Sequence, residues 1–238
     1  VKRLITYPDI SRQIPNMEIP EDFTELNRLQ GERWTGWFKG DGDNIASYLK
    51  SMADAGEDPA KTLHSFSQQM MNWGQNSLKP AVACMDSSRV IYAGGDDFLG
   101  VFYRNPPHPR LTASECIEWL AYFPQVWQEH HIPITVSVGF VWVAANVPLR
   151  DLLQHCRDAE KSAKKKGRDR IALRIVFNGG NWIEWVCPWW FLSKLRDYRD
   201  REGGNNWTHI YQDVAFLESR YAFGANQTDV ALALFQVY

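Results

Sequence analysis

The residues best suited to chemistry are two short runs of aspartates, each placed where a strand is expected to end. The first run is Asp-Gly-Asp-Asn at 41–44, which follows apolar residues that begin at Trp34. The second is Gly-Gly-Asp-Asp at 94–97, which lies between two β-rich runs with room only for a tight turn, so it predicts a hairpin with an acidic tip. Glycine and aspartate are also ordinary turn residues, and the hairpin alone would be explained equally well by a solvated turn. The two runs together favour a metal site.

Clustered carboxylates suit one kind of metal chemistry in particular. Magnesium prefers oxygen ligands and usually binds one or two carboxylates, with water and phosphate oxygens completing its octahedron. Three or four such side chains therefore fit two Mg²⁺ or Mn²⁺ ions, the arrangement used for in-line displacement at phosphorus. A calcium-binding EF-hand loop is excluded, because Ile45 stands where that loop needs an oxygen ligand after Asp41 and Asp43.

The glycines of both runs are expected to serve the same site. Gly94 and Gly95 can adopt positive φ and have no side chain, so the turn can be tight and a ligand can approach the backbone. Gly42 is expected to act in the same way after Asp41. A bulkier residue at these positions is predicted to block substrate and spare the fold.

The periodicity predicts strands and helices in the order β, α, β, β, α, β, α, β. The strands are expected near 34–41, on both sides of the hairpin tip, at 132–144 and at 170–177, while residues 79–86 extend or precede the hairpin. Helices are expected in two pieces between 45 and 73, at 112–131 with Ser114 as a cap, and at 149–166. The first six elements predict an α+β, ferredoxin-like sheet with helices on one face, in which the first strand lies beside the hairpin. Asp41 is then close to Asp96 and Asp97.

Composition narrows the class of protein. The 238 residues are 45% hydrophobic with a formal net charge of −2, which predicts a soluble globular protein with no overall electrostatic attraction to nucleic acid. No apolar run approaches 18 residues, so no membrane contact is expected. Four scattered cysteines without a C-x-x-C pair indicate neither zinc nor disulfides and favour a cytoplasmic setting. The six histidines show no ligand spacing.

Three regions are expected along the chain. Residues 1–32 are interpreted as an irregular lead-in, and residues 33–178 as the domain that carries the aspartates. Residues 179–238 are interpreted as a Trp-rich linker and a helical C-terminal segment belonging to a truncated domain, so the chain is expected to be a fragment. The tryptophans between 182 and 190 could stack on bases, but a role in packing is favoured.

Four motifs carry a resemblance to a known family. They are KGDGDN at 39–44, YAGGDDF at 92–98, TVSVG at 135–139 and AKKKGRDR at 163–170. Their order and spacing resemble the palm of GGDEF-type nucleotidyl cyclases and polymerases. The Gly-Gly-Asp-Asp form of the hairpin, with WVCPWW at 185–190, is more similar to the CRISPR polymerase, the large subunit of type III (Cmr-type) CRISPR effector complexes. The similarity covers roughly residues 35–190.

The resemblance implies roles for individual residues. Asp41, Asp96 and Asp97 would hold the divalent metals and form the catalytic set. Lys164, and more weakly Arg168, match positions that contact triphosphate, although a basic run of this kind is also typical of a solvated helix face. The same motifs assign nucleotide contacts to residues of the two acidic runs: Gly42, Asp43, Asn44, Gly94 and Gly95. Asn44 would reach a ribose or base edge, and could equally be a helix cap.

The resemblance also implies the function. Members of this family convert ATP into cyclic oligoadenylates when their complex has bound target RNA, so the expected partners are ATP and other subunits of a CRISPR ribonucleoprotein, with guide and target RNA contacted mainly through the complex. Two alternatives stay open. One is a palm that binds nucleotide or scaffolds a ribonucleoprotein without catalysis of its own. The other is a dinucleotide cyclase of the signalling type, although those enzymes carry Glu at the fourth hairpin position, where this chain has Asp97.

Overall fold

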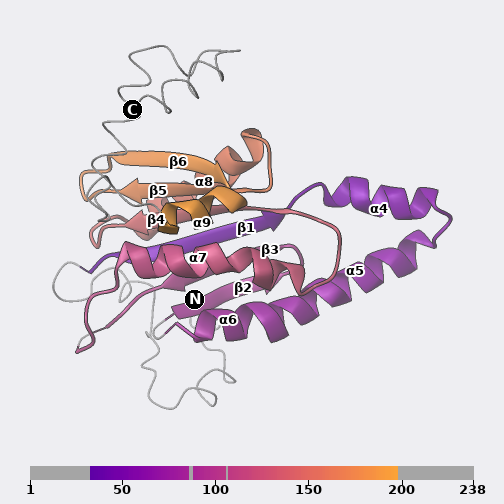
Figure 1. The fold of residues 1–238 in the computed structure, drawn as a ribbon, viewed down its shortest axis with the longest axis horizontal. Helices are drawn as coiled ribbons and strands as arrows, with labels where there is room; N and C mark the ends of the chain where they lie inside the picture. The colour runs from indigo at the N-terminus through magenta and orange to yellow at the C-terminus, as the bar shows by residue number, and fades with distance from the viewer. Residues whose placement is uncertain (1–32, 86–87, 106, 198–238) are drawn as a thin grey trace, which may run out of the picture. The chain divides into compact units, whose positions relative to one another are not determined.

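The fold is built on one six-stranded mixed sheet. The computed structural model describes residues 33–85, 88–105 and 107–197. The strands are β1 (Thr35–Gly42), β2 (Ser88–Gly94), β3 (Asp97–Phe102), β4 (Val136–Val143), β5 (Arg170–Val176) and β6 (Trp182–Pro188). Their order in the sheet is β2-β3-β1-β4-β5-β6, and all neighbours are antiparallel except β4 and β5 (Figure 1). The first four strands have the ferredoxin-like arrangement, so the predicted α+β fold is confirmed.

Helices cover both faces of this sheet. They are α4 (Ile45–Asp54), α5 (Pro59–Trp73), α6 (Lys79–Ala83), α7 (Ala113–Gln128), α8 (Leu149–Lys165) and α9 (Trp189–Asp197), with a π-helical turn at Gly74–Leu78 between α5 and α6. Both α5 and α7 pack on one face through Trp73 and Phe123, whose rings contact Phe98. The opposite face packs against α8. Figure 1 shows α4 and the first turns of α5 extending beyond the end of the sheet, and α4 accordingly buries no residue.

Glycines opposite phenylalanines let two central strands pair closely. Across β1 and β3, Phe38 lies opposite Gly100 and Gly40 opposite Phe98. Each ring covers its glycine, and a Cβ atom at Gly40 or Gly100 would lie 2.0 Å from a carbon of the facing ring. The absence of a side chain at these two positions therefore makes room for the aromatic layer beneath α7.

Close packing on the opposite face sets the position of α8. A Cβ atom at Gly139 of β4 would lie 2.4 Å from the backbone nitrogen of Glu160 and 2.7 Å from Cβ of Ala159. Four apolar side chains of α8, at Leu152, Cys156, Ala159 and Ala163, are completely buried against the sheet. The helix is thereby held over β4 and β1.

Local elements differ from some of the expectations. Of the two roles expected for residues 79–86, residues 79–83 precede the hairpin as helix α6 and do not extend it. Helix α7 is capped by Thr112, whose hydroxyl accepts from the backbone of Glu115 in a capping box, and not by Ser114.

The largest difference from the sequence interpretation is strand β6. Residues 182–188 pair with β5 as the sixth strand, where a Trp-rich linker was expected. The sheet therefore continues past residue 178, and the chain divides into compact units at Val1–Ser193 and Lys194–Tyr238. The lead-in at 1–32 and the helical tail beyond 197 lie outside the described residues. Within the described part of the chain, no helix has the length and apolar character needed to cross a membrane.

The contact at Gly139 generates a stability prediction. Gly139→Ala should lower the free energy of unfolding by about 1–3 kcal/mol, because the new methyl group must push the backbone of α8 away from β4. Gly179→Ala is the matched control, since a Cβ atom there meets no atom within 4 Å. Urea denaturation measures both variants, and equal stabilities would contradict the close packing.

Candidate functional site

Strand pairing brings the three aspartates to one edge of the sheet. Asp41 near the end of β1 lies directly opposite Asp97 at the start of β3. The backbone nitrogen of Gly42 donates to the carbonyl of Asp96 at 3.2 Å, which ties β1 to the hairpin tip. The expected proximity of the two acidic runs is therefore present in the structure.

Only one of the two glycines in the hairpin, Gly95, has a backbone conformation that favours glycine. Gly95 has a φ of 82° and Asp96 is not among the residues with positive φ, which is the pattern of a type II′ turn. Gly94 belongs to β2. A Cβ atom at either glycine would meet no atom within 4 Å, so open space lies beside the backbone of the tip.

The need for glycine at position 42 has a different physical reason from the one expected. Its φ is not positive, and it is the last residue of β1. A Cβ atom there would lie 2.9 Å from Cδ1 of Ile45 and 3.0 Å from Cβ of Asp96. A larger residue would therefore displace the hairpin tip, which corrects the expectation that such a change spares the fold.

The crowding of carboxylates has a clear electrostatic signature at Asp96. Burial, a side-chain hydrogen bond with Asp41, and the negative charges of Asp41 and Asp97 raise the pKa of Asp96 from 3.8 to about 6. The neutral form of Asp96 is favoured because it can donate to Asp41 and avoids a third charge. A divalent cation would relieve the same repulsion.

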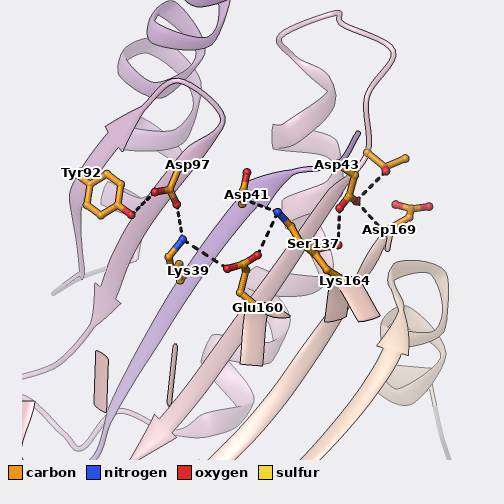
Figure 2. A network of polar contacts seen from close by, with 10 residues as sticks. Lys39, Asp41, Asp43, Tyr92, Asp97, Ser137, Glu160, Lys164 and Asp169 are labelled. Atoms are coloured by element: carbon orange, nitrogen blue, oxygen red, sulfur yellow. Dashed lines mark hydrogen bonds and ion pairs between the residues drawn. The ribbon is translucent and has the colours of Figure 1, made fainter. Parts of the chain in front are cut away.

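Two lysines neutralise the other two aspartates. The ammonium group of Lys164 on α8 contacts Asp41 Oδ2 at 2.5 Å, and that of Lys39 on β1 contacts Asp97 Oδ1 at 2.5 Å. The hydroxyl of Tyr92 also donates to Asp97, at 2.7 Å (Figure 2). Burial by itself lowers the pKa of Lys164, but the hydrogen bond and charge of Asp41 raise it above its ordinary value.

Sequence reasoning missed Lys39, Tyr92 and Glu160, although two of them have a local signal. Lys39 stands two residues before Asp41, so the two side chains share one face of β1. Glu160 stands four residues before Lys164 on one helix face, and its carboxylate contacts that lysine at 3.2 Å. Tyr92 has no such signal, because the β-bulge between Val90 and Tyr92 shifts its register.

Asp43 occupies a different environment from Asp41. Its side chain is buried and accepts from Thr135 Oγ1 at 2.9 Å, Ser137 Oγ at 2.8 Å and the backbone nitrogen of Asp169 at 3.0 Å. Figure 2 shows it directed toward β4 and the α8–β5 loop. With three protein donors on its two oxygens, Asp43 is a positioning residue in this structure, whereas the sequence interpretation gave it a nucleotide contact.

The loop that Asp43 holds has an uncommon backbone. Gly167, Arg168 and Asp169 follow one another with positive φ values of 125°, 59° and 50°. A residue with a side chain pays about 1–3 kcal/mol for such a conformation, so the hydrogen bond from Asp169 to Asp43 offsets part of this cost. The anchored loop then fixes the end of α8, where Lys164 lies.

Arg168 and Asn44 lie near the acidic edge but are exposed. No hydrogen bond or ion pair of the Arg168 side chain is found within the described ranges. Asn44 is the N-cap residue of α4, with a φ of 57°, and its side chain makes no capping hydrogen bond. Both side chains are therefore available to a ligand, although the structure does not join them to the aspartates.

The donor set fits a divalent metal in its chemistry. Three carboxylates share one edge, and burial together with the hydrogen bond and charge of Asp41 raises the pKa of Asp96. Among the described residues, however, no three Asp, Glu, His or Cys side chains form a group that could enclose an ion, with Asp41 and Asp97 paired to lysines. Asp41, Asp96 and Asp97 would hold the metal after those ion pairs are released.

Comparison with known proteins agrees with a palm domain. The profile of Cas10/Cmr2, second palm domain, matches residues 35–172. This is more than half of the chain, which therefore belongs to the Cas10/Cmr2 family, the CRISPR polymerase indicated by the sequence. No curated protein gives a significant match.

Solved structures show the same fold. A Csm1-Csm4 cassette in complex with one ATP is 18% identical with a TM-score of 0.54, covering 94% of this chain and 34% of its own. A Csm1-Csm4 subcomplex of the type III-A CRISPR-Csm interference complex is 20% identical with a TM-score of 0.51, covering 81% and 28%. A cassette in complex with cA3 is 18% identical with a TM-score of 0.50, covering 81% and 28%. This chain thus spans about a third of the length of these relatives.

The electrostatics of the aspartates predict a pH dependence. The folded pKa of Asp96 lies above its ordinary value, so the native state binds more protons than the unfolded state between pH 3.8 and about 6. Stability should therefore fall as the pH rises through this window. Carboxyl ¹³C NMR should show Asp96 titrating near pH 6, and Asp41→Asn should lower that midpoint. A midpoint near 4 in the unsubstituted protein would contradict the crowding.

The role of Asp43 predicts a loss of stability. Asp43→Ala leaves three donors without their acceptor and should lower the free energy of unfolding by about 2–4 kcal/mol. Asp54→Ala, at an exposed position of α4, should change it by less than about 0.5 kcal/mol. Urea denaturation compares the two, and a stable Asp43→Ala variant would show that its carboxylate is not a structural anchor.

Proposed function

We propose that this chain is the catalytic palm of a metal-dependent nucleotidyltransferase that joins ATP through 3′–5′ linkages with release of pyrophosphate, as a cyclic oligoadenylate synthetase of type III CRISPR defence. The observation that carries the proposal is the register of β1 and β3, which sets Asp41 opposite Asp97. Membership of the Cas10/Cmr2 second palm family supports it, as do the complexes of fold relatives with ATP and cA3.

Each part of the site has a task in this reaction. Two Mg²⁺ or Mn²⁺ ions, when bound, supply activation of a ribose 3′-hydroxyl and charge neutralisation at the departing pyrophosphate. Asp41, Asp96 and Asp97 hold the ions. Lys164 binds the triphosphate, with Arg168 as a second cation. Since phosphoryl transfer needs positioning more than covalent catalysis, these contacts are the main contribution of the protein.

The substrate path follows the open backbone of the hairpin. No atom lies within 4 Å of a Cβ atom built at Gly94 or Gly95, so a nucleotide can lie against the turn. Asn44, exposed at the start of α4, is suited to bond a ribose or base edge. The open backbone at Gly94 and Gly95 and the exposed amide of Asn44 support this assignment of the nucleotide contacts.

A binding module is the second candidate function. The observation that favours it is the pairing of Asp41 and Asp97 with lysines, which balances these carboxylates without metal. The palm would then bind nucleotide, or scaffold a ribonucleoprotein, without catalysis of its own. In both cases the proposed partners are other subunits of a CRISPR complex, through which guide and target RNA are contacted. A dinucleotide cyclase is disfavoured by Asp97 at the fourth hairpin position.

Calorimetry of ATP binding tests the proposal. ATP should bind the chain only with Mg²⁺ or Mn²⁺, and Asp41→Asn or Asp97→Asn should weaken binding at least about tenfold, because each removes a charged metal ligand. Asp54→Asn, at an exposed aspartate outside the site, should bind as the unsubstituted chain does.

The outcomes separate the two candidate functions. Equal binding without metal would support the module that holds nucleotide, and no binding by correctly folded protein would leave only scaffolding. Where metal-dependent binding is found, analysis of ATP products in the assembled complex distinguishes cyclic oligoadenylates from cyclic dinucleotides.

A further inference from the structure

Glu160 lies between two lysines, and each of its carboxylate oxygens contacts one of them. Oε1 is 3.2 Å from the ammonium nitrogen of Lys164, and Oε2 is 3.7 Å from that of Lys39. The same two ammonium groups contact Asp41 and Asp97 at 2.5 Å (Figure 2). Each lysine therefore bridges one aspartate of the proposed metal site and one oxygen of Glu160.

Burial increases from the aspartates toward Glu160. The exposed fraction of the side chain is 42% for Asp97 and 30% for Asp41, falls to 25% for Lys164 and 15% for Lys39, and is 9% for Glu160. An ammonium group as buried as that of Lys39 needs an anionic partner to stay charged. Glu160 can remain that partner after an aspartate has turned to another cation.

The backbone of Glu160 is also fixed in place. Its nitrogen packs against Gly139 of β4 so closely that a Cβ atom there would lie 2.4 Å away. The aspartates are at the open edge and the lysine side chains are long, so a change of partners requires only the ends of these side chains to move. Glu160 is the rigid element of the cluster.

We infer that Lys39 and Lys164 form a lysine pair held by Glu160. The two lysines form ion pairs with Asp97 and Asp41 until a divalent cation binds these aspartates, and then they bind the triphosphate. This inference rests on the proposed function and adds Lys39 as a further triphosphate-binding residue and Glu160 as a positioning residue. Both ammonium groups lie beside the carboxylates that hold the metal, which is where the phosphates bound to that metal must also lie. An ammonium group released from a carboxylate can donate to phosphate oxygen with the same charge-assisted geometry.

The inference predicts opposite effects on two ligands. Lys39→Met should bind Mn²⁺ alone about three- to tenfold more tightly, because the metal no longer displaces an ammonium group from Asp97. The same variant should bind Mn²⁺-ATP about tenfold more weakly, because a charged donor to phosphate is lost. Electron paramagnetic resonance measures Mn²⁺ alone, and calorimetry measures Mn²⁺-ATP.

Two further variants separate this role from a structural one. Glu160→Gln should bind Mn²⁺ alone about three- to tenfold more weakly, since it removes a negative charge and commits both lysines to the aspartates. Substitutions at the two ends of one ion pair then shift metal affinity in opposite directions, which a folding defect cannot produce. Lys165→Met is the charge-matched control, because Lys165 is exposed on the same helix, and should change neither ligand.

The result that overturns the inference is a Lys39→Met variant that binds Mn²⁺ more weakly, or binds Mn²⁺-ATP as the unsubstituted chain does. If Asp97→Asn loses Mn²⁺-ATP in that experiment, the proposed function stands and only the lysine pair fails. If the unsubstituted chain binds no Mn²⁺-ATP, both fail. Should Glu160→Gln not fold, the two responses of Lys39→Met decide.

Discussion

Like charges forced together by strand pairing are the constraint on which this site depends. The register of β1 and β3 sets Asp41 opposite Asp97, and the turn adds Asp96 beside them. Carboxylates at this separation cannot all stay ionised without positive charge nearby. Accordingly, the pKa of Asp96 is raised, and the other two aspartates form ion pairs with lysines. In the proposed function, a divalent cation would take the place of these lysines beside Asp41 and Asp97.

The position of α8 provides that balance. The helix approaches β4 at Gly139, where no side chain separates the two backbones. Glu160 and Lys164, one turn apart, then reach across β4 to β1, and Lys164 contacts Asp41. Just beyond the C-terminal end of the helix, where Lys164 lies, the buried Asp43 accepts from the backbone of Asp169 and holds a loop with three consecutive positive φ values. The packing of α8 on β4 and the anchoring of the loop that follows it thus both fix the positions of Glu160 and Lys164 relative to Asp41.

Two aspartates separated by a single glycine have different environments for a simple geometric reason. β1 ends at Gly42, so the chain turns before Asp43 and no longer follows the alternation of the strand. Asp41 stays at the open edge with the hairpin, while Asp43 enters the protein beside Ser137 of β4. One of them is suited to bind a ligand from solution, and the other stabilises the fold that supports it.

The sequence by itself determined the elements whose signals are local. The hairpin at 94–97, the strand before Asp41 and the amphipathic stripe of α8 each depend on residues within a few positions of one another, and the order of these elements implied the ferredoxin-like pairing. From that pairing alone, Asp41 could be expected beside Asp96 and Asp97.

Only the tertiary structure decided the rest. The contacts Lys164–Asp41 and Asp169–Asp43 join residues 123 and 126 positions apart. The contact of Glu160 with two lysines depends on how closely α8 packs on the sheet. Strand β6 could not be predicted from the sequence, because its exposed tryptophans lack the alternation of a half-buried strand. Such features are set by packing between distant segments, for which single-chain periodicity contains no signal.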